Sequence, residues 1–186
     1  MNQEGIGLGK FSVRFIEFML FWNHCELSAR QILQLLLGEG ETAMAVAAEI
    51  KNQPLCDALR AAGRDKKFSH IRQHIDHFVT GYRVMVDYRN YYVHGIFGVK
   101  AGVGGLLSLS GKGGRLKYHQ DTLTIEKLAE MSSHLHMLMA YGAALQKELG
   151  AQGDGIESLV STYSGSLEKP KWPPELKKLP RYIQEP

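Results

Sequence analysis

Apolar side chains recur at intervals of three and four residues over three long stretches of the chain. These stretches are residues 11–37, 69–93 and 122–149. This spacing places the apolar side chains on one face of an α-helix, and each stretch is therefore predicted to be a helix that buries that face. Gly38 and Gly40 follow the first stretch, in keeping with the frequent use of glycine at helix C-termini.

Shorter elements are predicted between these helices. Residues 42–62 have the pattern of one or two short helices, and Pro54 stands at a helix start. Residues 105–119 read GLLSLSGKGGRLKYH, in which two β-compatible runs flank a Gly-rich turn, and this pattern predicts a hairpin. Thr124 then precedes the last helix and is predicted to cap its N-terminus.

The two ends of the chain lack helical periodicity. Residues 1–10 are rich in glycine and are predicted to form a flexible arm. Residues 150–186 contain all but one of the six prolines and are predicted to form an extended tail. The expected fold is therefore all-α, a bundle of four to five helices over residues 11–149 with a hairpin inserted at about residues 105–119.

Composition is that of one intracellular domain. The chain has 186 residues, of which 44% are hydrophobic, enough for a single domain with a core. Its formal charge of +3 is too small to identify a nucleic-acid binder without a local basic patch. Cys25 and Cys56 form neither a metal motif nor a disulfide framework, and we expect both to be core thiols in a reducing cytoplasm. No apolar run is long enough to predict a membrane association.

The end of the helix predicted for residues 69–93 carries the residues best suited to catalysis. Residues 87–97 read DYRNYYVHGIF and bring Arg89, Asn90 and His94 into one short window before Gly95. A guanidinium can fork onto two phosphate oxygens, and an imidazole can give or take a proton near neutral pH. Such a set could activate a ribose 2′-hydroxyl and stabilise the phosphorane that follows, with no metal ion. The alternative interpretation is structural, because the macrodipole favours a cation and a His at a helix C-terminus, where glycine is a natural cap.

The segment RNYYVH, residues 89–94, resembles the Arg-(four to six residues)-His signature of the HEPN domain, in which a polar residue, often Asn, follows the Arg. The order of helices over residues 11–149 is also similar to that family. The resemblance implies a HEPN-like helical bundle that acts on RNA as a homodimer, with the motif helices of two subunits facing a shared cleft. It implies catalytic roles for Arg89, Asn90 and His94, with no cofactor and no metal ion.

One position departs from the family branch that is paired with small nucleotidyltransferases. That branch resembles Arg-x4-His-x-Tyr, whereas this chain has Ile96 two residues after His94. The departure weakens the expectation of regulation by nucleotide transfer onto a tyrosine, although an antitoxin or nucleotidyltransferase stays among the expected partners. Lys112, Arg115 and Lys117 lie in the predicted hairpin and are candidate contacts to an RNA backbone or, alternatively, side chains of a solvated turn.

Further polar residues are candidates for supporting roles. Glu26 lies on the first predicted helix, where a carboxylate could orient an imidazole or pair with Arg89; the alternative is an exposed acid. His70, His74 and His77 share one helix face and could bind Zn²⁺. No fourth ligand is evident, so a solvated or interface stripe is the preferred interpretation and no metal site is predicted.

The sequence thus predicts a cytoplasmic, metal-independent endoribonuclease of HEPN type, as found in prokaryotic defence or toxin–antitoxin systems. Two alternatives stay open. The first keeps the fold as a non-catalytic module that binds nucleotide, RNA or a partner protein. The second is a helical interaction protein unrelated to HEPN. The completeness of the motif favours the nuclease, because a degenerate scaffold would be free to lose Arg89 or His94.

Overall fold

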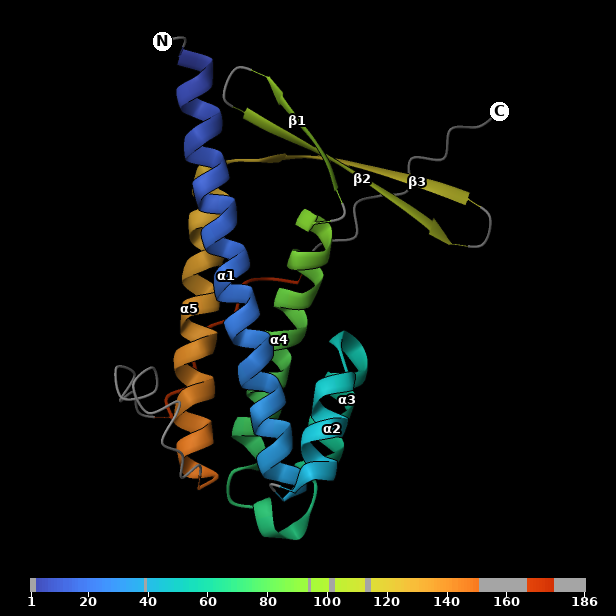
Figure 1. Cartoon of the computed structure of the whole chain (residues 1–186), viewed down its shortest axis with the longest axis vertical. Helices are drawn as coiled ribbons and strands as arrows, with labels where there is room; N and C mark the ends of the chain where they lie inside the picture. Colours follow the sequence, from blue (N-terminus) through green and yellow to red (C-terminus); the bar gives the residue numbers. More distant parts are fainter. Residues whose placement is uncertain are drawn as a thin grey trace.

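The fold, taken from a computed structural model, is predominantly helical, as the periodicity predicts. The structure describes residues 3–38, 40–93, 95–100, 103–112, 115–150 and 167–175, and their side chains over residues 9–38, 40–93, 123–150 and 167–175. The helices are α1 (Gln3–Leu37), α2 (Glu41–Glu49), α3 (Asn52–Ala62), α4 (Arg72–Val93) and α5 (Ile125–Glu148), with a short 3₁₀ helix at Lys66–Phe68 (Figure 1). The strands are β1 (Gly95–Lys100), β2 (Val103–Lys112) and β3 (Arg115–Leu123). Within these described residues, no helix combines the length and the apolarity needed to cross a membrane.

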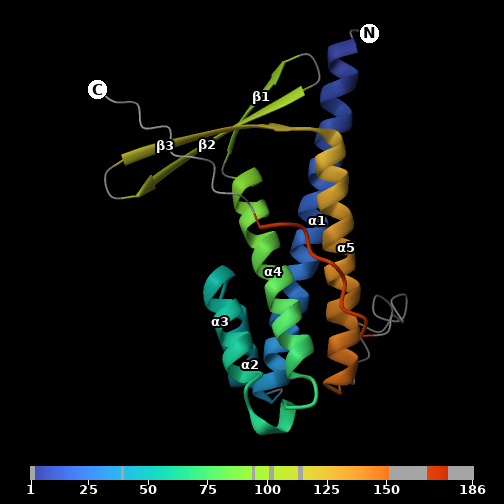
Figure 2. The ribbon, with the colours of Figure 1, turned by 180° about the vertical axis from the view of Figure 1, so that it is seen from behind.

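The core lies where α1, α4 and α5 run side by side along the length of the molecule (Figures 1 and 2). Trp22 of α1, Phe78 and Tyr82 of α4, and Leu135 of α5 are at most 1% exposed. The Cys25 thiol of α1 donates a hydrogen bond to the carbonyl oxygen of Leu135 at 3.3 Å. The core therefore joins helices from opposite ends of the sequence, while α2 and α3 cover the C-terminal half of α1.

Helix boundaries follow the local sequence signals. The side chain of Thr124 accepts a hydrogen bond from the backbone N–H of Lys127 at 3.2 Å, so the predicted N-cap of α5 is confirmed. Gly38 follows α1 with a φ of 97°, a left-handed conformation that favours glycine. Residues 42–62 contain the two predicted short helices, and Pro54 lies in the first turn of α3, where a backbone N–H has no partner within the helix.

The arm predicted for residues 1–10 is instead helical from Gln3 onward. α1 begins there and continues without a break to Leu37. Each glycine in this segment costs about 1 kcal/mol relative to Ala, which is why the sequence alone suggests an arm. Extending an existing helix gains one hydrogen bond for each residue fixed, whereas starting a helix fixes several residues for the first bond. The packed part of α1, which includes Phe11 at 8% exposure, supplies that start.

A three-stranded antiparallel sheet, in the order β1-β2-β3, lies in the region where the sequence predicts a hairpin. β2 and β3 pair from Gly104–Leu123 to Lys112–Arg115, and β1 pairs with the other edge of β2. The sequence does not predict β1, because Gly95 stands where a helix cap is expected. In the structure Gly95 is the first residue of β1. The sheet is inserted between α4 and α5 in the chain and lies beside the end of α4 (Figure 1).

Residues 167–175, which we name the strap, are extended and lie against α4 and α5 (Figure 2). The sequence predicts an extended tail over residues 150–186 but not that any part of it packs on the bundle. Leu167 and Trp172 pack against the core, and Pro173 is buried. The other parts of the predicted tail, residues 151–166 and 176–186, lie outside the described residues.

Candidate functional site

The last turns of α4 hold two of the three predicted catalytic residues. Arg89 and Asn90 are adjacent on the helix, and both are partly exposed. Arg89 Nη1 donates a hydrogen bond to Asn90 Oδ1 at 3.1 Å. Arg89 Nε is buried and has no hydrogen-bond partner among the described residues. An unpaired buried donor costs about 1–3 kcal/mol of folding free energy. The guanidinium therefore keeps donor capacity that the described part of the fold does not use.

Aromatic side chains hold this end of α4 in place. Tyr92 is 4% exposed, and its ring meets the ring of Phe18 on α1 edge-on, with the centroids 5.5 Å apart. The ring centroids of Tyr88 and Tyr91 lie 6.0 and 5.8 Å from that of Tyr92. Aromatic pairs at these separations contribute about 0.5–1.5 kcal/mol beyond the burial of their area. Arg89 thus projects from a turn whose backbone is fixed by its neighbours.

His94, the predicted proton-transfer residue, lies outside the described residues. α4 ends at Val93 and β1 begins at Gly95, on either side of it. Ile96, two residues after His94, lies in β1 and pairs with Leu107 of β2. The predicted convergence of Arg89 and His94 on one site therefore stays a prediction.

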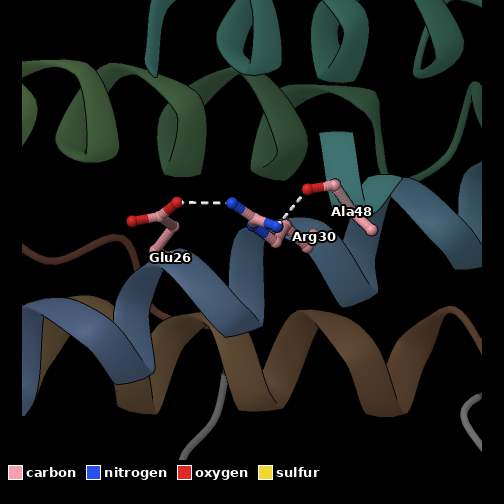
Figure 3. A network of polar contacts seen from close by, with 3 residues as sticks. All are labelled: Glu26, Arg30 and Ala48. Atoms are coloured by element: carbon pink, nitrogen blue, oxygen red, sulfur yellow. Dashed lines mark hydrogen bonds and ion pairs between the residues drawn. The ribbon is translucent and has the colours of Figure 1, made fainter. Parts of the chain in front are cut away.

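Glu26, predicted as a supporting carboxylate, pairs with a different arginine. Its Oε1 accepts a hydrogen bond from Arg30 Nη2 at 2.6 Å, and Arg30 Nη1 donates to the carbonyl oxygen of Ala48 at 2.5 Å (Figure 3). This network ties the last turn of α2 to α1. The spacing of Glu26 and Arg30 at i, i+4 is the sequence signal that favours this pair.

Of the interpretations open for Glu26, the pairing with Arg89 is therefore not the one that the structure shows, and the side chain is partly buried and not a fully exposed acid. On α4, Glu26 lies near Tyr82. Burial raises the pKa of the Tyr82 hydroxyl most, and the negative charge of Glu26 raises it further. Tyr82 precedes Arg89 by two helical turns, about 10 Å along the axis. Glu26 thus belongs to the middle of the bundle and not to the end of α4.

The histidine stripe of α4 serves packing. His74 Nδ1 and the Tyr141 hydroxyl of α5 are hydrogen bonded at 2.9 Å, and His77 Nε2 is bonded to the carbonyl oxygen of Pro170 in the strap at 2.8 Å. His70 is exposed. Burial lowers the pKa of His74, and neighbouring cationic groups lower it further. Among the described residues, no three His, Cys, Asp or Glu side chains are grouped so as to hold a metal ion.

The three basic residues predicted to contact RNA lie at one tip of the sheet. Lys112 pairs with Arg115 across β2 and β3, and Lys117 pairs with Ser110 two positions further from the turn. This tip points away from the bundle (Figure 1). The side chains of the three cations lie outside the described part of the chain, so their contact with RNA stays a prediction.

The two cysteines are core residues, as predicted. Cys25 and Cys56 are both 0% exposed. Burial raises the pKa of both thiols, that of Cys56 to about 11. Both are therefore protonated at neutral pH, and neither is a candidate nucleophile.

Comparison with known proteins identifies no relative. No protein-family model, no curated protein and no solved structure matches the chain. The functional interpretation therefore rests on the motif and on the contacts described above.

Proposed function

We propose that the protein is a metal-independent endoribonuclease of HEPN type, with Arg89, Asn90 and His94 as its catalytic residues. The observation that carries the proposal is the state of Arg89, whose guanidinium bonds to Asn90 and whose buried Nε has no partner among the described residues. Neither ion pair of the described side chains involves Arg89. A cation that no described side chain neutralises is available to an anionic ligand such as a phosphodiester.

The proposed reaction uses the RNA's own 2′-hydroxyl as the nucleophile. His94 removes the proton of that hydroxyl, the 2′ oxygen bonds to phosphorus, and the bond between phosphorus and the 5′ oxygen breaks. Arg89 stabilises the negative charge that grows on the non-bridging oxygens, and Asn90 orients the guanidinium. The 5′ oxygen leaves with a proton from a second imidazole, so the products are a 2′,3′-cyclic phosphate and a 5′-hydroxyl.

A second copy of the chain would supply that second imidazole. The proposal therefore includes a homodimer with α4 of each subunit at or beside a shared cleft, since closed twofold pairs are the commonest oligomers. Lys112, Arg115 and Lys117 are the proposed contacts to the RNA backbone, and an antitoxin-type protein is the proposed regulator. Light scattering at tens of micromolar tests the dimer, and a monomer at that concentration contradicts it.

The test of catalysis compares the wild type with His94→Ala and Arg89→Ala on a mixed RNA pool, with and without EDTA. Each substitution should lower the cleavage rate by a factor of about 10²–10⁴. EDTA should have no effect, the products should carry 2′,3′-cyclic phosphates, and RNA methylated at the 2′-hydroxyl should resist cleavage. Arg14→Ala is the matched control, because Arg14 is an exposed cation of α1 paired with Glu17 at 2.6 Å, and it should cleave like the wild type.

Equal cleavage by the wild type and His94→Ala would contradict the nuclease proposal. The non-catalytic binding module would then be supported if the wild type retained RNA or nucleotide and Arg89→Ala bound it more weakly. Equal binding by the wild type, Arg89→Ala and Arg14→Ala would contradict that module too, because the end of α4 would then have no part in binding.

A further inference from the structure

The strap is held on α4 by hydrogen bonds that span about three turns of that helix. At one end, His77 Nε2 is bonded to the carbonyl oxygen of Pro170 at 2.8 Å. At the other end, the Tyr88 hydroxyl donates to the carbonyl oxygen of Pro174 at 3.0 Å. Between them, Trp172 Nε1 donates to the carbonyl oxygen of His77 at 3.0 Å. Two of these bonds thus recognise the strap through its backbone, and the third recognises its indole.

Trp172 occupies a place where α4 has no side chain. A Cβ atom at Gly81 would lie 2.4, 2.6 and 2.8 Å from three ring atoms of Trp172, so a larger residue there would displace the indole. The ring of His77 stacks on it with the centroids 5.0 Å apart, and Tyr141 of α5 meets it edge-on at 6.1 Å. Gly81 costs α4 about 1 kcal/mol relative to Ala, and the contact with Trp172 gives this glycine a structural reason.

We infer that this surface is a binding site for an extended peptide in which a tryptophan is flanked by prolines, and that the strap is its resident ligand. We name the surface the seat, defined by His77, Gly81, Tyr88 and Tyr141. An aromatic anchor in a fitted position, combined with hydrogen bonds to the peptide backbone, is a general way to recognise extended segments. The prolines of the segment PKWPP, residues 170–174, restrict the peptide before it binds and so lower the entropy cost of ordering it.

The strap acts as a tethered ligand, because residues 151–166 connect it to the end of α5. A short tether gives such a ligand an effective concentration in the millimolar range. A free peptide of the same sequence therefore competes poorly with the strap of the wild type and binds once the resident tryptophan is removed. This inference is independent of RNA cleavage, because no part of it uses Arg89 or His94.

The experiment adds a fluorescent peptide of residues 167–175, LEKPKWPPE, to the full-length protein and measures the anisotropy of the peptide. Trp172→Ala should bind the peptide at least about tenfold more tightly than the wild type, because its own strap has lost the anchor. The double variant Trp172→Ala, Gly81→Ala should return to the wild-type level, because the added Cβ fills the place of the indole. A peptide with Ala in place of Trp is the matched ligand control and should not bind.

Equal binding by the wild type and Trp172→Ala would overturn the inference, as would binding that survives in the double variant or with the control peptide. Circular dichroism establishes that each variant is folded. If Trp172→Ala does not fold, Gly81→Ala alone carries the test through tryptophan fluorescence. Trp22 is 1% exposed, so a red shift of the emission would report Trp172 leaving the seat, and an unchanged emission would overturn the inference.

Discussion

Two histidines in the first half of α4 and an arginine near its end make different kinds of polar contact. In the first half, the imidazoles of His74 and His77 are both hydrogen bonded to groups from other elements, one on α5 and one on the strap. In the last turns, the described hydrogen bond of Arg89 is made to Asn90, its neighbour in sequence. His74 and His77 therefore join α4 to other elements, and Tyr88 does so through Pro174, whereas the described bond of Arg89 reaches no second element.

This difference separates the two candidate sites that the sequence offers on the same helix. The histidine stripe has the spacing of a metal site, but His74 and His77 already have partners, which makes it a packing feature. The position of Arg89 on the helix has no such distinctive spacing, yet its buried Nε has no partner among the described residues. A polar group without a described partner is a better candidate for a ligand contact than one that is already bonded.

The largest contrast should come from removing one side chain in each half. Phe78 is 0% exposed and its ring lies 6.3 Å from that of Tyr82, so Phe78→Ala should lower the free energy of unfolding by about 3–5 kcal/mol. Arg89→Ala should lower it by less than about 1 kcal/mol, because the only described partner of Arg89 is Asn90. Urea unfolding measures both values. A cost at Arg89 close to that at Phe78 would break the comparison.

Replacing two helical glycines by alanine should change the stability of the protein by smaller amounts and in opposite directions. A Cβ at Gly142 of α5 would lie 2.5 Å from Ser28 Oγ and 2.9 Å from a ring carbon of Phe78, both in the core. Gly142→Ala should therefore destabilise the protein by about 1–3 kcal/mol, despite the better helix propensity of Ala. Gly9→Ala is the control, because among the described residues a Cβ there would meet nothing within 4 Å beyond its own stretch of helix, and it should stabilise α1 by up to about 1 kcal/mol. Thermal unfolding that moved both variants in one direction would contradict this account.

Two tyrosines of α4 test whether a described partner decides what a hydroxyl group contributes to stability. The Tyr88 hydroxyl bonds to the carbonyl oxygen of Pro174, so Tyr88→Phe should destabilise the protein by about 0.5–1.5 kcal/mol. The Tyr82 hydroxyl is buried and has no partner among the described residues, so Tyr82→Phe should be neutral or slightly stabilising. Both are measured by chemical unfolding. A larger loss at Tyr82 than at Tyr88 would show that the Tyr82 hydroxyl has a partner in the folded protein.

The smallest effect should be a dependence of stability on pH. Burial lowers the pKa of His74 and of His134, so the folded state favours the neutral imidazole at both positions. The unfolded chain then takes up protons first, and stability should fall as the pH drops below the ordinary histidine pKa of about 6.5 and through the lowered values. Unfolding measured on both sides of about pH 6.5 should show a weaker dependence in His74→Gln, His134→Gln. An unchanged slope in that variant would assign the effect to other groups.

Most of the helical framework is predictable from the sequence because it depends on local signals. The periodic stretches, the cap at Thr124 and the stop at Gly38 all act within a few residues. The exceptions are places where a longer-range cause prevails. Residues 3–10 are helical because a packed helix already exists beyond them, and β1 forms because β2 pairs with it, although Gly95 has the local signal of a helix cap.

The candidate site is predictable in part for the same reason. The placement of Arg89 and Asn90 late in a long helix follows from periodicity, and the structure bears it out. The Glu26–Arg30 pair could have been predicted, because residues four apart on a helix lie next to each other. The meeting of Trp172 with His77, 95 residues apart in sequence, has no local signal at all. Only the unexplained glycine in the middle of α4, at position 81, gives a hint that another residue approaches the helix closely.

The packing of α1 against α5 also sets an order of events during synthesis of the chain. Cys25 and Leu135, which are hydrogen bonded across the two helices, are 110 residues apart. A ribosome working at about 5–20 residues per second needs roughly 5–20 seconds to make that interval. Throughout this time the face of α1 around Phe21 and Cys25, which packs against His136 and Leu135 of α5, lacks the helix that covers it in the folded protein. Nascent chains therefore pass through a period of seconds in which premature association competes with folding.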